Sequence, residues 1–212
     1  LQANISPHDL TPRFIWGFRG RNTLFLRGEK MKNEALQINK TPGMGMWFAN
    51  LDAYVSGSLV GGWLYPLDYN SFDEFAEAIK RVTKNADEVA IHDYDDCPDM
   101  GEYPDHEELY NVIHAIEDSY IDNEILIKYM SNQHDYSVDL VQEAEESFVT
   151  TADKFKDFAY EQAEQDIENT VNAEAVQFVF NNFDYDGYAR DLEHSYTIIE
   201  LDNYDVAVFS NY

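Results

Sequence analysis

The 212-residue sequence contains one cysteine, 14 basic residues and no long hydrophobic run. The single cysteine, Cys97, cannot form an internal disulfide, which excludes a disulfide-stapled secreted scaffold and fits a reducing compartment. No stretch approaches the roughly 18 to 20 apolar residues of a membrane span, and no charged-then-apolar start with a cleavage site opens the chain. We therefore expect a cytoplasmic protein that has no membrane partner.

Nucleotide-binding and catalytic motifs are also missing. The sequence contains neither G-x-G-x-x-G nor a P-loop, and we interpret Gly61-Gly62 as a backbone turn. Cys97 has no adjacent base or cationic neighbour to lower its pKa, which argues against a nucleophile. Carboxylates are so numerous that proximity between two of them carries little information. We expect no enzyme active site and no cofactor.

One acidic run resembles a calcium-binding loop. It contains Asp93, Asp95, Asp96 and Asp99. The EF-hand register that starts at Asp93 places Pro98 at position 6, where the turn requires glycine, so we expect no metal. His92 beside Asp93 suggests half of an acid–base pair, but a histidine that ends an apolar strand is more often a structural hydrogen-bonding residue. A small metal-dependent hydrolase that uses His92, Asp93 and Asp95 stays open as an alternative.

Acidic side chains dominate the composition. The chain has 41 Asp and Glu against 14 Lys and Arg, a net charge of −27. Residues 1–43 hold three acids and seven bases, a net charge of +4, so residues 44–212 carry 38 acids and seven bases, a net charge of −31. Electrostatic repulsion of this size opposes folding into a compact structure. We therefore expect that the negative electrostatic field of residues 44–212 serves the function of the protein. The candidate uses are binding of cations, binding of basic protein surfaces and imitation of a polyanion, whereas nucleic acid itself is excluded as a partner.

The hydrophobic pattern predicts a folded α+β protein behind a short extension. Hydrophobic residues make up 44% of the chain, which is enough for real cores. Residues 1–43 contain turn signals without sustained periodicity and are expected to be a basic, loosely ordered extension or leader. Residues 44–97 form the first α+β domain, with strands over 46–51 and 88–92 and a helix opened by the capping box at 71–74.

A second, mainly helical domain is expected over residues 98–147. Asp105 can accept hydrogen bonds from the first backbone N–H groups of one helix, and Asp122 can do the same for the next. Apolar residues at helical spacing follow both positions. From Tyr136 the pattern is helical again, in three pieces that continue into the third domain.

The third domain is expected over residues 148–212. It begins with an acidic helix, continues with a helix whose apolar face includes Tyr185 and Tyr188, and closes with a hairpin. The hairpin strands cover 196–201 and 206–209, on either side of a turn at Asp202-Asn203.

Carboxylates at helical spacing mark the start of this third domain. We call the set Asp153, Asp157, Glu161, Glu164 and Glu168 the acidic stripe. At about 100° per residue its members fall within an arc of roughly 80°, while apolar residues such as Phe158 and Ala159 lie toward the opposite side. Neighbours are about 5 to 6 Å apart, close to the spacing of phosphates along a DNA strand, and 31 net charges correspond to roughly 50 Å of duplex, or about 15 base pairs. Both an ordinary solvated helix face and a DNA-like surface account for this pattern.

Three segments resemble the ArdA family of antirestriction proteins in order and spacing. Residues 47–63 are similar to the family's opening strand and its Tyr-x-x-Gly-x-Leu-x-Gly-x-Trp signature, and residues 88–95 resemble its Ile-His-Asp-Tyr-Glu strand end. Residues 183–193, followed by 206–209, resemble its Phe-Asp-Tyr-Glu-x-Phe-Ala-Arg-Asp-Leu-Glu helix and closing strand. The likeness covers about residues 44–212. Val89 and Ser56 depart from the tryptophan and asparagine that many relatives have at these positions.

The resemblance implies an elongated, curved chain of three small α/β and helical domains, usually a homodimer, that imitates bent B-form DNA. Such proteins from phages and mobile elements occupy the DNA-binding groove of type I restriction-modification enzymes, formed by the methyltransferase and specificity subunits, in the host cytoplasm. The family's acidic antirestriction segment corresponds here to residues 139–168. The candidate partner-binding residues in it are Asp139, Glu143, Glu145, Glu146, Asp153, Asp157, Glu161, Glu164 and Glu168.

Besides the hydrolase, two other functions stay open. One is inhibition of a different DNA-binding defence complex, such as a CRISPR effector, and the other is an acidic chaperone of basic proteins. Tight divalent-cation binding would favour the hydrolase, whereas equal binding to a methyltransferase and to any basic protein would favour the chaperone.

Overall fold

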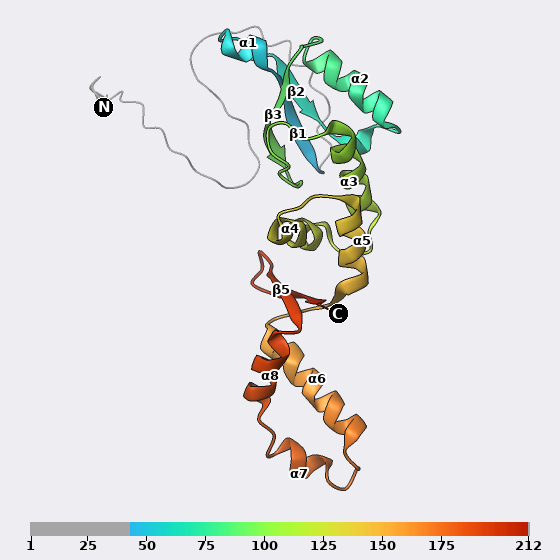
Figure 1. The fold of residues 1–212 in the computed structure, drawn as a ribbon, viewed down its shortest axis with the longest axis vertical. Coiled ribbons are helices and arrows are strands. Elements are labelled where there is room, and N and C mark those ends of the chain that lie inside the picture. Colours follow the sequence, from blue (N-terminus) through green and yellow to red (C-terminus); the bar gives the residue numbers. More distant parts are fainter. Residues whose placement is uncertain (1–42, 212) are drawn as a thin grey trace, which may run out of the picture. The chain divides into compact units, whose positions relative to one another are not determined.

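A computed structural model describes residues 43–211, which fold into eight α-helices and two three-stranded antiparallel sheets (Figure 1). This mixed architecture confirms the predicted α+β class. The N-terminal extension predicted over residues 1–43 lies outside the described residues except for Gly43.

The first sheet has the strand order β2-β1-β3 and is built from residues of the first predicted domain. Strand β1 (Gly45–Asn50) lies between β2 (Gly61–Leu64) and β3 (Val89–Asp95). Met46 and Phe48 of β1 are fully buried, so the apolar strand predicted here is confirmed.

Gly61 and Gly62 do not form the predicted turn, because they are the first two residues of β2. They pair with Ala49 and Phe48 of β1. A Cβ atom on Gly61 would collide with the carbonyl oxygen of Phe48, so glycine at this position allows the two backbones to approach closely. The glycine pair is therefore a strand feature that the turn interpretation missed.

Two α-helices and one turn of 3-10 helix accompany the first sheet. Helix α1 (Leu51–Val55), which the sequence pattern did not indicate, follows β1 directly, and η1 (Pro66–Asp68) follows β2. Helix α2 (Phe72–Val82) begins where the capping box predicted, since Ser71 Oγ accepts a hydrogen bond from Glu74 N at 3.3 Å. Its Phe75 ring packs on Phe48 at 5.7 Å between centroids, which fixes α2 against the sheet.

Three helices follow, and two of them begin at the predicted caps. Asp105 Oδ1 accepts hydrogen bonds from the backbone at the start of α3 (His106–Asp118), and Asp122 Oδ1 does so for α4 (Asn123–Gln133). Helix α5 (Val138–Ser147) comes next. Both side-chain caps satisfy N–H groups that a helix leaves without internal partners.

Strand β4 (Phe148–Ala152) replaces part of the predicted helical run. It pairs with β6 (Val206–Ser210), which also pairs with β5 (Tyr196–Glu200), so the second sheet has the order β4-β6-β5. The β5–β6 hairpin confirms the predicted closing hairpin. The β-branched run Val149-Thr-Thr151 suits a strand, and its burial alternates along the chain, as expected when one face is covered.

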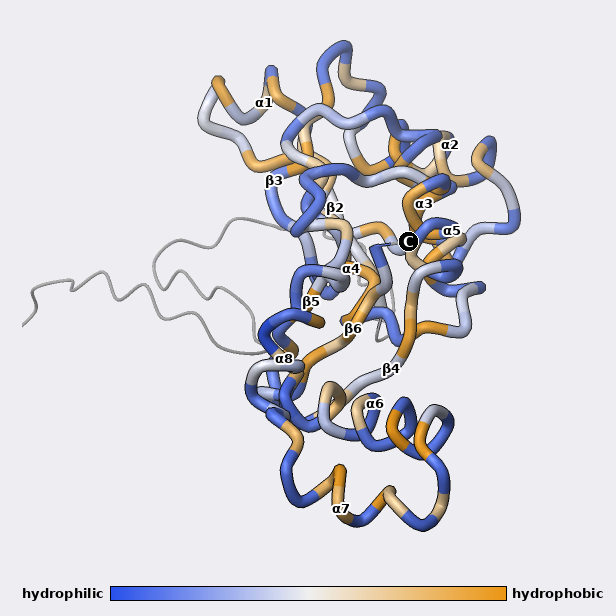
Figure 2. Tube along the Cα trace, turned by 60° about the horizontal axis from the view of Figure 1, so that its bottom comes forward, coloured by the Kyte–Doolittle hydropathy of each residue, from blue (hydrophilic) through white to orange (hydrophobic). Residues whose placement is uncertain are grey.

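Helices α6 (Phe155–Thr170), α7 (Val176–Phe180) and α8 (Tyr185–Glu193) lie between β4 and β5 in the chain. Figure 2 shows apolar and polar residues alternating along α6, whereas β6 is apolar along most of its length. The side chains of β6 enter two cores. Phe209 joins a cluster with α3, α4 and α5, and Val208 joins Phe158 of α6.

Candidate partner-binding surface

Helix α6 carries four members of the acidic stripe on its exposed face. Asp157, Glu161, Glu164 and Glu168 are all exposed, and at about 100° per residue they lie within an arc of roughly 60°. Asp153 does not belong to this arc, because β4 ends at Ala152 and the helix begins only at Phe155. The prediction of five carboxylates on one helix face is therefore wrong for Asp153, which lies exposed in the bend before α6.

The opposite face of α6 is apolar and buried, as the spacing predicted. Phe158, Ala159 and Ala163 are at most 5% exposed, and Phe155 is half-buried. The Phe158 ring lies 5.3 Å from the ring of Tyr196 in β5. Burial of this face fixes the rotation of α6 about its axis, and that rotation directs the four carboxylates to solvent.

A set of polar contacts that includes no member of the stripe joins α6 to α8. Lys156 Nζ lies 2.5 Å from Asp186 Oδ1, and Tyr160 donates a hydrogen bond to the same oxygen at 2.6 Å. These two donors lower the pKa of Asp186. Tyr188 donates to Asp166 at 2.7 Å, and burial together with this bond raises the pKa of Tyr188 to about 12. These residues position α6, although the sequence pattern gave no signal for the contacts.

In the described part of the chain, no cation forms an ion pair with the stripe carboxylates on α6. Within residues 43–211, the ion pairs join Lys80 to Glu77, Lys128 to Glu124 and Asp202, and Lys156 to Asp186. None of them involves a member of the stripe. The exposed face of α6 therefore presents four carboxylates that no cation of residues 43–211 pairs with, and they lie about 5 to 6 Å apart, since residues three or four apart are neighbours on a helix.

The four candidate carboxylates of α5 divide into two groups. Asp139, Glu143 and Glu146 are exposed and lie within about 60° of one another on the helix, whereas Glu145 lies on a different face. The Glu145 side chain is half-buried and accepts a hydrogen bond from Ser119 Oγ at 2.6 Å. Glu143 accepts a longer one, 3.3 Å, from the Tyr129 hydroxyl. Glu145 is thus engaged inside the fold, while Asp139 and Glu146 face solvent.

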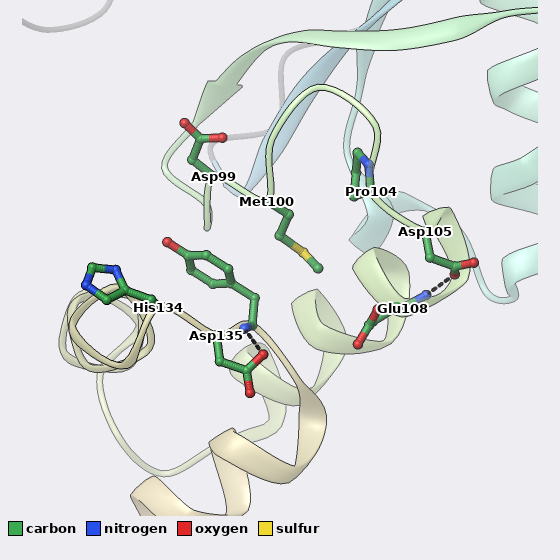
Figure 3. A pocket seen from close by; sticks show the side chains of 8 residues that line it. Asp99, Met100, Pro104, Asp105, Glu108, His134 and Asp135 are labelled. Carbon is green, nitrogen blue, oxygen red and sulfur yellow. Dashed lines mark hydrogen bonds between the residues drawn. The ribbon is translucent and has the colours of Figure 1, made fainter.

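A pocket of about 380 Å³ lies between the loop after β3 and the link from α4 to α5 (Figure 3). Asp99, Met100, Pro104, Asp105, Glu108, His134, Asp135 and Tyr136 line it. Two of the carboxylates accept hydrogen bonds from backbone N–H groups. Asp105 accepts one from Glu108 N at 2.9 Å, and Asp135 accepts one from Tyr136 N at 2.8 Å. These contacts give Asp105 and Asp135 structural roles.

The residues of the hydrolase alternative do not assemble into a metal site in the described part of the chain. His92 is exposed, and its ring lies edge-on to the ring of Tyr54 at 4.8 Å. Asp93 accepts a hydrogen bond from Tyr94 N. Across residues 43–211, no three His, Cys, Asp or Glu side chains form a group that could hold a metal ion.

Cys97 is a partly buried structural thiol. Its Sγ donates to the carbonyl oxygen of Gly45 at 3.1 Å, and burial raises the pKa of the thiol to about 12. Because the reactive form of cysteine is the thiolate, Cys97 lacks the ionisation that a nucleophile requires at neutral pH.

Comparison with known proteins identifies the family. The sequence model of the family described as antirestriction protein (ArdA) matches residues 46–204, three-quarters of the chain. This region contains all nine candidate carboxylates. No curated protein matches the sequence. Among the helices of residues 43–211, none is long and apolar enough to cross a membrane. ArdA proteins are antirestriction proteins that act on restriction-modification enzymes and are not a known enzyme family. The chain belongs to the ArdA family of antirestriction proteins.

Proposed function

We propose that the protein inhibits type I restriction-modification enzymes by imitating DNA and occupying the groove between their methyltransferase and specificity subunits. The observation that carries this proposal is the exposed face of α6, where Asp157, Glu161, Glu164 and Glu168 have no ion-pair partner among residues 43–211. Family membership supports the class of target. The net charge of −31 over residues 44–212 supports a negative electrostatic field that attracts a basic groove.

Competition with DNA follows from elementary electrostatics. A groove that binds DNA presents arginines and lysines at the spacing of phosphates, and carboxylates about 5 to 6 Å apart meet the same side chains. The field of the acidic body accelerates encounter with the basic groove and repels duplex DNA from the complex. Because the interaction is between charges, we expect the dissociation constant to rise with salt concentration.

An elongated, curved arrangement of three small domains and a homodimeric assembly are further parts of this proposal. Both are supported by the family resemblance and not by the contacts described above. In a two-fold symmetric dimer each acidic face would occur twice, once on each half of a long groove. Sedimentation at micromolar concentration tests the assembly, with the dimer mass as the expected result.

The experiment that tests the proposal combines the protein, a type I methyltransferase and a labelled DNA duplex. We expect the protein to release the duplex from the methyltransferase and to bind no duplex alone. An unrelated basic protein without a DNA groove serves as the control, and the protein should bind it much more weakly. Direct binding of the duplex by the protein, or no release of duplex from several such enzymes, would contradict the proposal.

A further inference from the structure

The most exposed large hydrophobic side chain described by the structure lies at the end of the β5–β6 hairpin. Tyr204 is 92% exposed, more than any other large apolar or aromatic side chain of residues 43–211. Its backbone has a φ of 72°, in the left-handed region that glycine and asparagine adopt far more readily than tyrosine. We call residues Asp202–Asp205 the hairpin tip.

Hydrogen bonds within the hairpin hold Tyr204 in this conformation. Leu201 N donates to Asp205 O at 2.9 Å, and Tyr204 N donates to Leu201 O at 3.0 Å. Asp205 N donates to Asn203 Oδ1 at 3.0 Å, and the Asn203 amide donates to Asp205 Oδ2 at 2.7 Å. The left-handed residue is therefore part of a turn that four hydrogen bonds stabilise.

The hairpin tip is also bonded to a distant helix. Lys128 Nζ of α4 lies 2.6 Å from Asp202 Oδ1, and the backbone N of Asp202 donates to Glu124 Oε1 at 2.8 Å. These contacts join residues 74 and 78 positions apart in the sequence. They fix the hairpin tip on α4, and the Tyr204 ring extends from this fixed tip into solvent.

Tyr204 combines a strained backbone, an exposed aromatic ring and a hairpin tip that is bonded to α4. This combination indicates that the ring contacts another molecule. Strained residues persist where the surrounding structure imposes them, and they are concentrated at sites that bind other molecules. Tyrosine and arginine are the residue types that most often dominate protein interfaces, and an aromatic face attracts a guanidinium. Acidic residues flank the ring, with Asp202 and Asp205 on the tip and Glu200 exposed at the end of β5.

We propose that the hairpin tip is a second contact surface for the partner enzyme, in which the Tyr204 ring stacks on an arginine guanidinium of the basic DNA-binding groove. The inference rests on the proposed function and specifies one further residue through which the groove is recognised. Charge complementarity selects this occupant. Residues 44–212 of a second copy carry only seven bases against 38 acids and so offer few cations to the carboxylates of the tip, whereas a DNA-binding groove is rich in them.

The test measures the dissociation constant of the full-length protein for a type I methyltransferase, together with unfolding in urea. Tyr204→Ala should raise the dissociation constant about 30-fold, the loss expected of a residue that dominates an interface. Tyr204→Phe should retain the affinity, because it keeps the ring. Tyr204→Gly should lose affinity as Tyr204→Ala does, yet unfold at the same or a higher urea concentration, because glycine adopts the left-handed conformation without strain. Tyr103→Ala removes another exposed ring, 64% exposed, and should leave the affinity unchanged.

Each result has one meaning. If the wild-type protein binds and Tyr204→Ala binds equally well, the role of the hairpin tip is refuted while the proposed function stands. If Tyr204→Ala changes the sedimentation mass and leaves methyltransferase affinity intact, the tip contacts a second copy and the inference is wrong. If the wild-type protein does not bind the methyltransferase, the proposed function and this inference both fail.

Discussion

Neutralising the exposed face of α6 should strengthen the fold and weaken the inhibitor. The variant replaces Asp157 with Asn and Glu161, Glu164 and Glu168 with Gln, which keeps the shape of each side chain and removes four charges. All four are exposed, and the structure gives none of them an ion-pair partner among residues 43–211. Folding and binding are therefore expected to change in opposite directions.

The expected gain in stability follows from the spacing on the helix. The four residues form three consecutive like-charge pairs three or four positions apart, and each pair destabilises a helix by about 0.2 to 0.5 kcal/mol. Asp157 lies in the first turn of α6, where a negative charge is favourable, and Glu168 lies near its end, where a negative charge is unfavourable, so these two effects offset each other. We expect the free energy of unfolding to rise by about 1 kcal/mol, measured by urea unfolding.

The expected loss of binding follows from the number of contacts. An exposed ion pair contributes about 0 to 1 kcal/mol, so four of them at a middle value contribute roughly 2 kcal/mol, which is about a 30-fold rise in the dissociation constant. Titration of a type I methyltransferase with each variant measures it. Single replacements should change the constant by less than about fivefold.

A charge-matched control separates the α6 face from bulk charge. It replaces four other exposed carboxylates, Glu102, Glu107, Glu108 and Asp118, with their amides. Asp105 is left intact because it caps α3. The control should change the dissociation constant only a few-fold through weaker steering. If both variants lose affinity equally, only net charge matters, and if neither loses affinity, the face of α6 is an ordinary solvated surface.

Three further predictions concern the fold that supports this surface. Phe209→Ala should lower the free energy of unfolding by about 3 to 5 kcal/mol in a urea titration, because Phe209 is 1% exposed and packs on Tyr129 at 4.3 Å; an effect below about 1 kcal/mol would contradict this packing. Gly61→Ala should also lower the midpoint temperature of thermal unfolding, because the new Cβ collides with the backbone of β1. An unchanged midpoint would show that β1 and β2 can move apart with no loss of stability. Burial lowers the pKa of His106 below its ordinary value of 6.5, against a smaller opposite effect of Asp105, so the folded protein disfavours protonation and loses stability as the pH falls through 6.5. Relative to His106→Gln, the wild-type protein should therefore lose stability between about pH 7.5 and pH 5; a constant difference over this range would refute the effect of burial.

Local signals predicted the elements that begin with a side-chain cap. Ser71, Asp105 and Asp122 each precede an apolar residue pattern at helical spacing, and each accepts the expected backbone hydrogen bond. Strand β4 was missed because its partner β6 lies more than 50 residues later in the chain. Local periodicity carries no information on that pairing, and the acidic helices on both sides of β4 favoured a helical interpretation. Gly61-Gly62 was misread for the same reason, since only the pairing with β1 explains the two glycines.

The candidate surface was predictable to the extent that it depends on helical spacing. The exposed arc from Asp157 to Glu168 follows directly from residues three and four apart, and so does the buried face that contains Phe158. The bond between Glu145 and Ser119 was not predictable, because it joins residues 26 positions apart. The conformation of Tyr204 was missed as well, since the sequence placed the hairpin turn at the two preceding residues.

Competition between the protein and DNA is the most direct test of the account. The concentration of protein that half-inhibits a type I methyltransferase is measured at several concentrations of its DNA substrate. A DNA mimic and DNA occupy the same groove. We therefore predict that the half-inhibitory concentration rises in proportion to the DNA concentration, once that concentration exceeds the dissociation constant of the enzyme for DNA. The maximal methylation rate at saturating DNA should be unchanged. A half-inhibitory concentration that does not depend on DNA would place the protein elsewhere on the enzyme and contradict DNA mimicry.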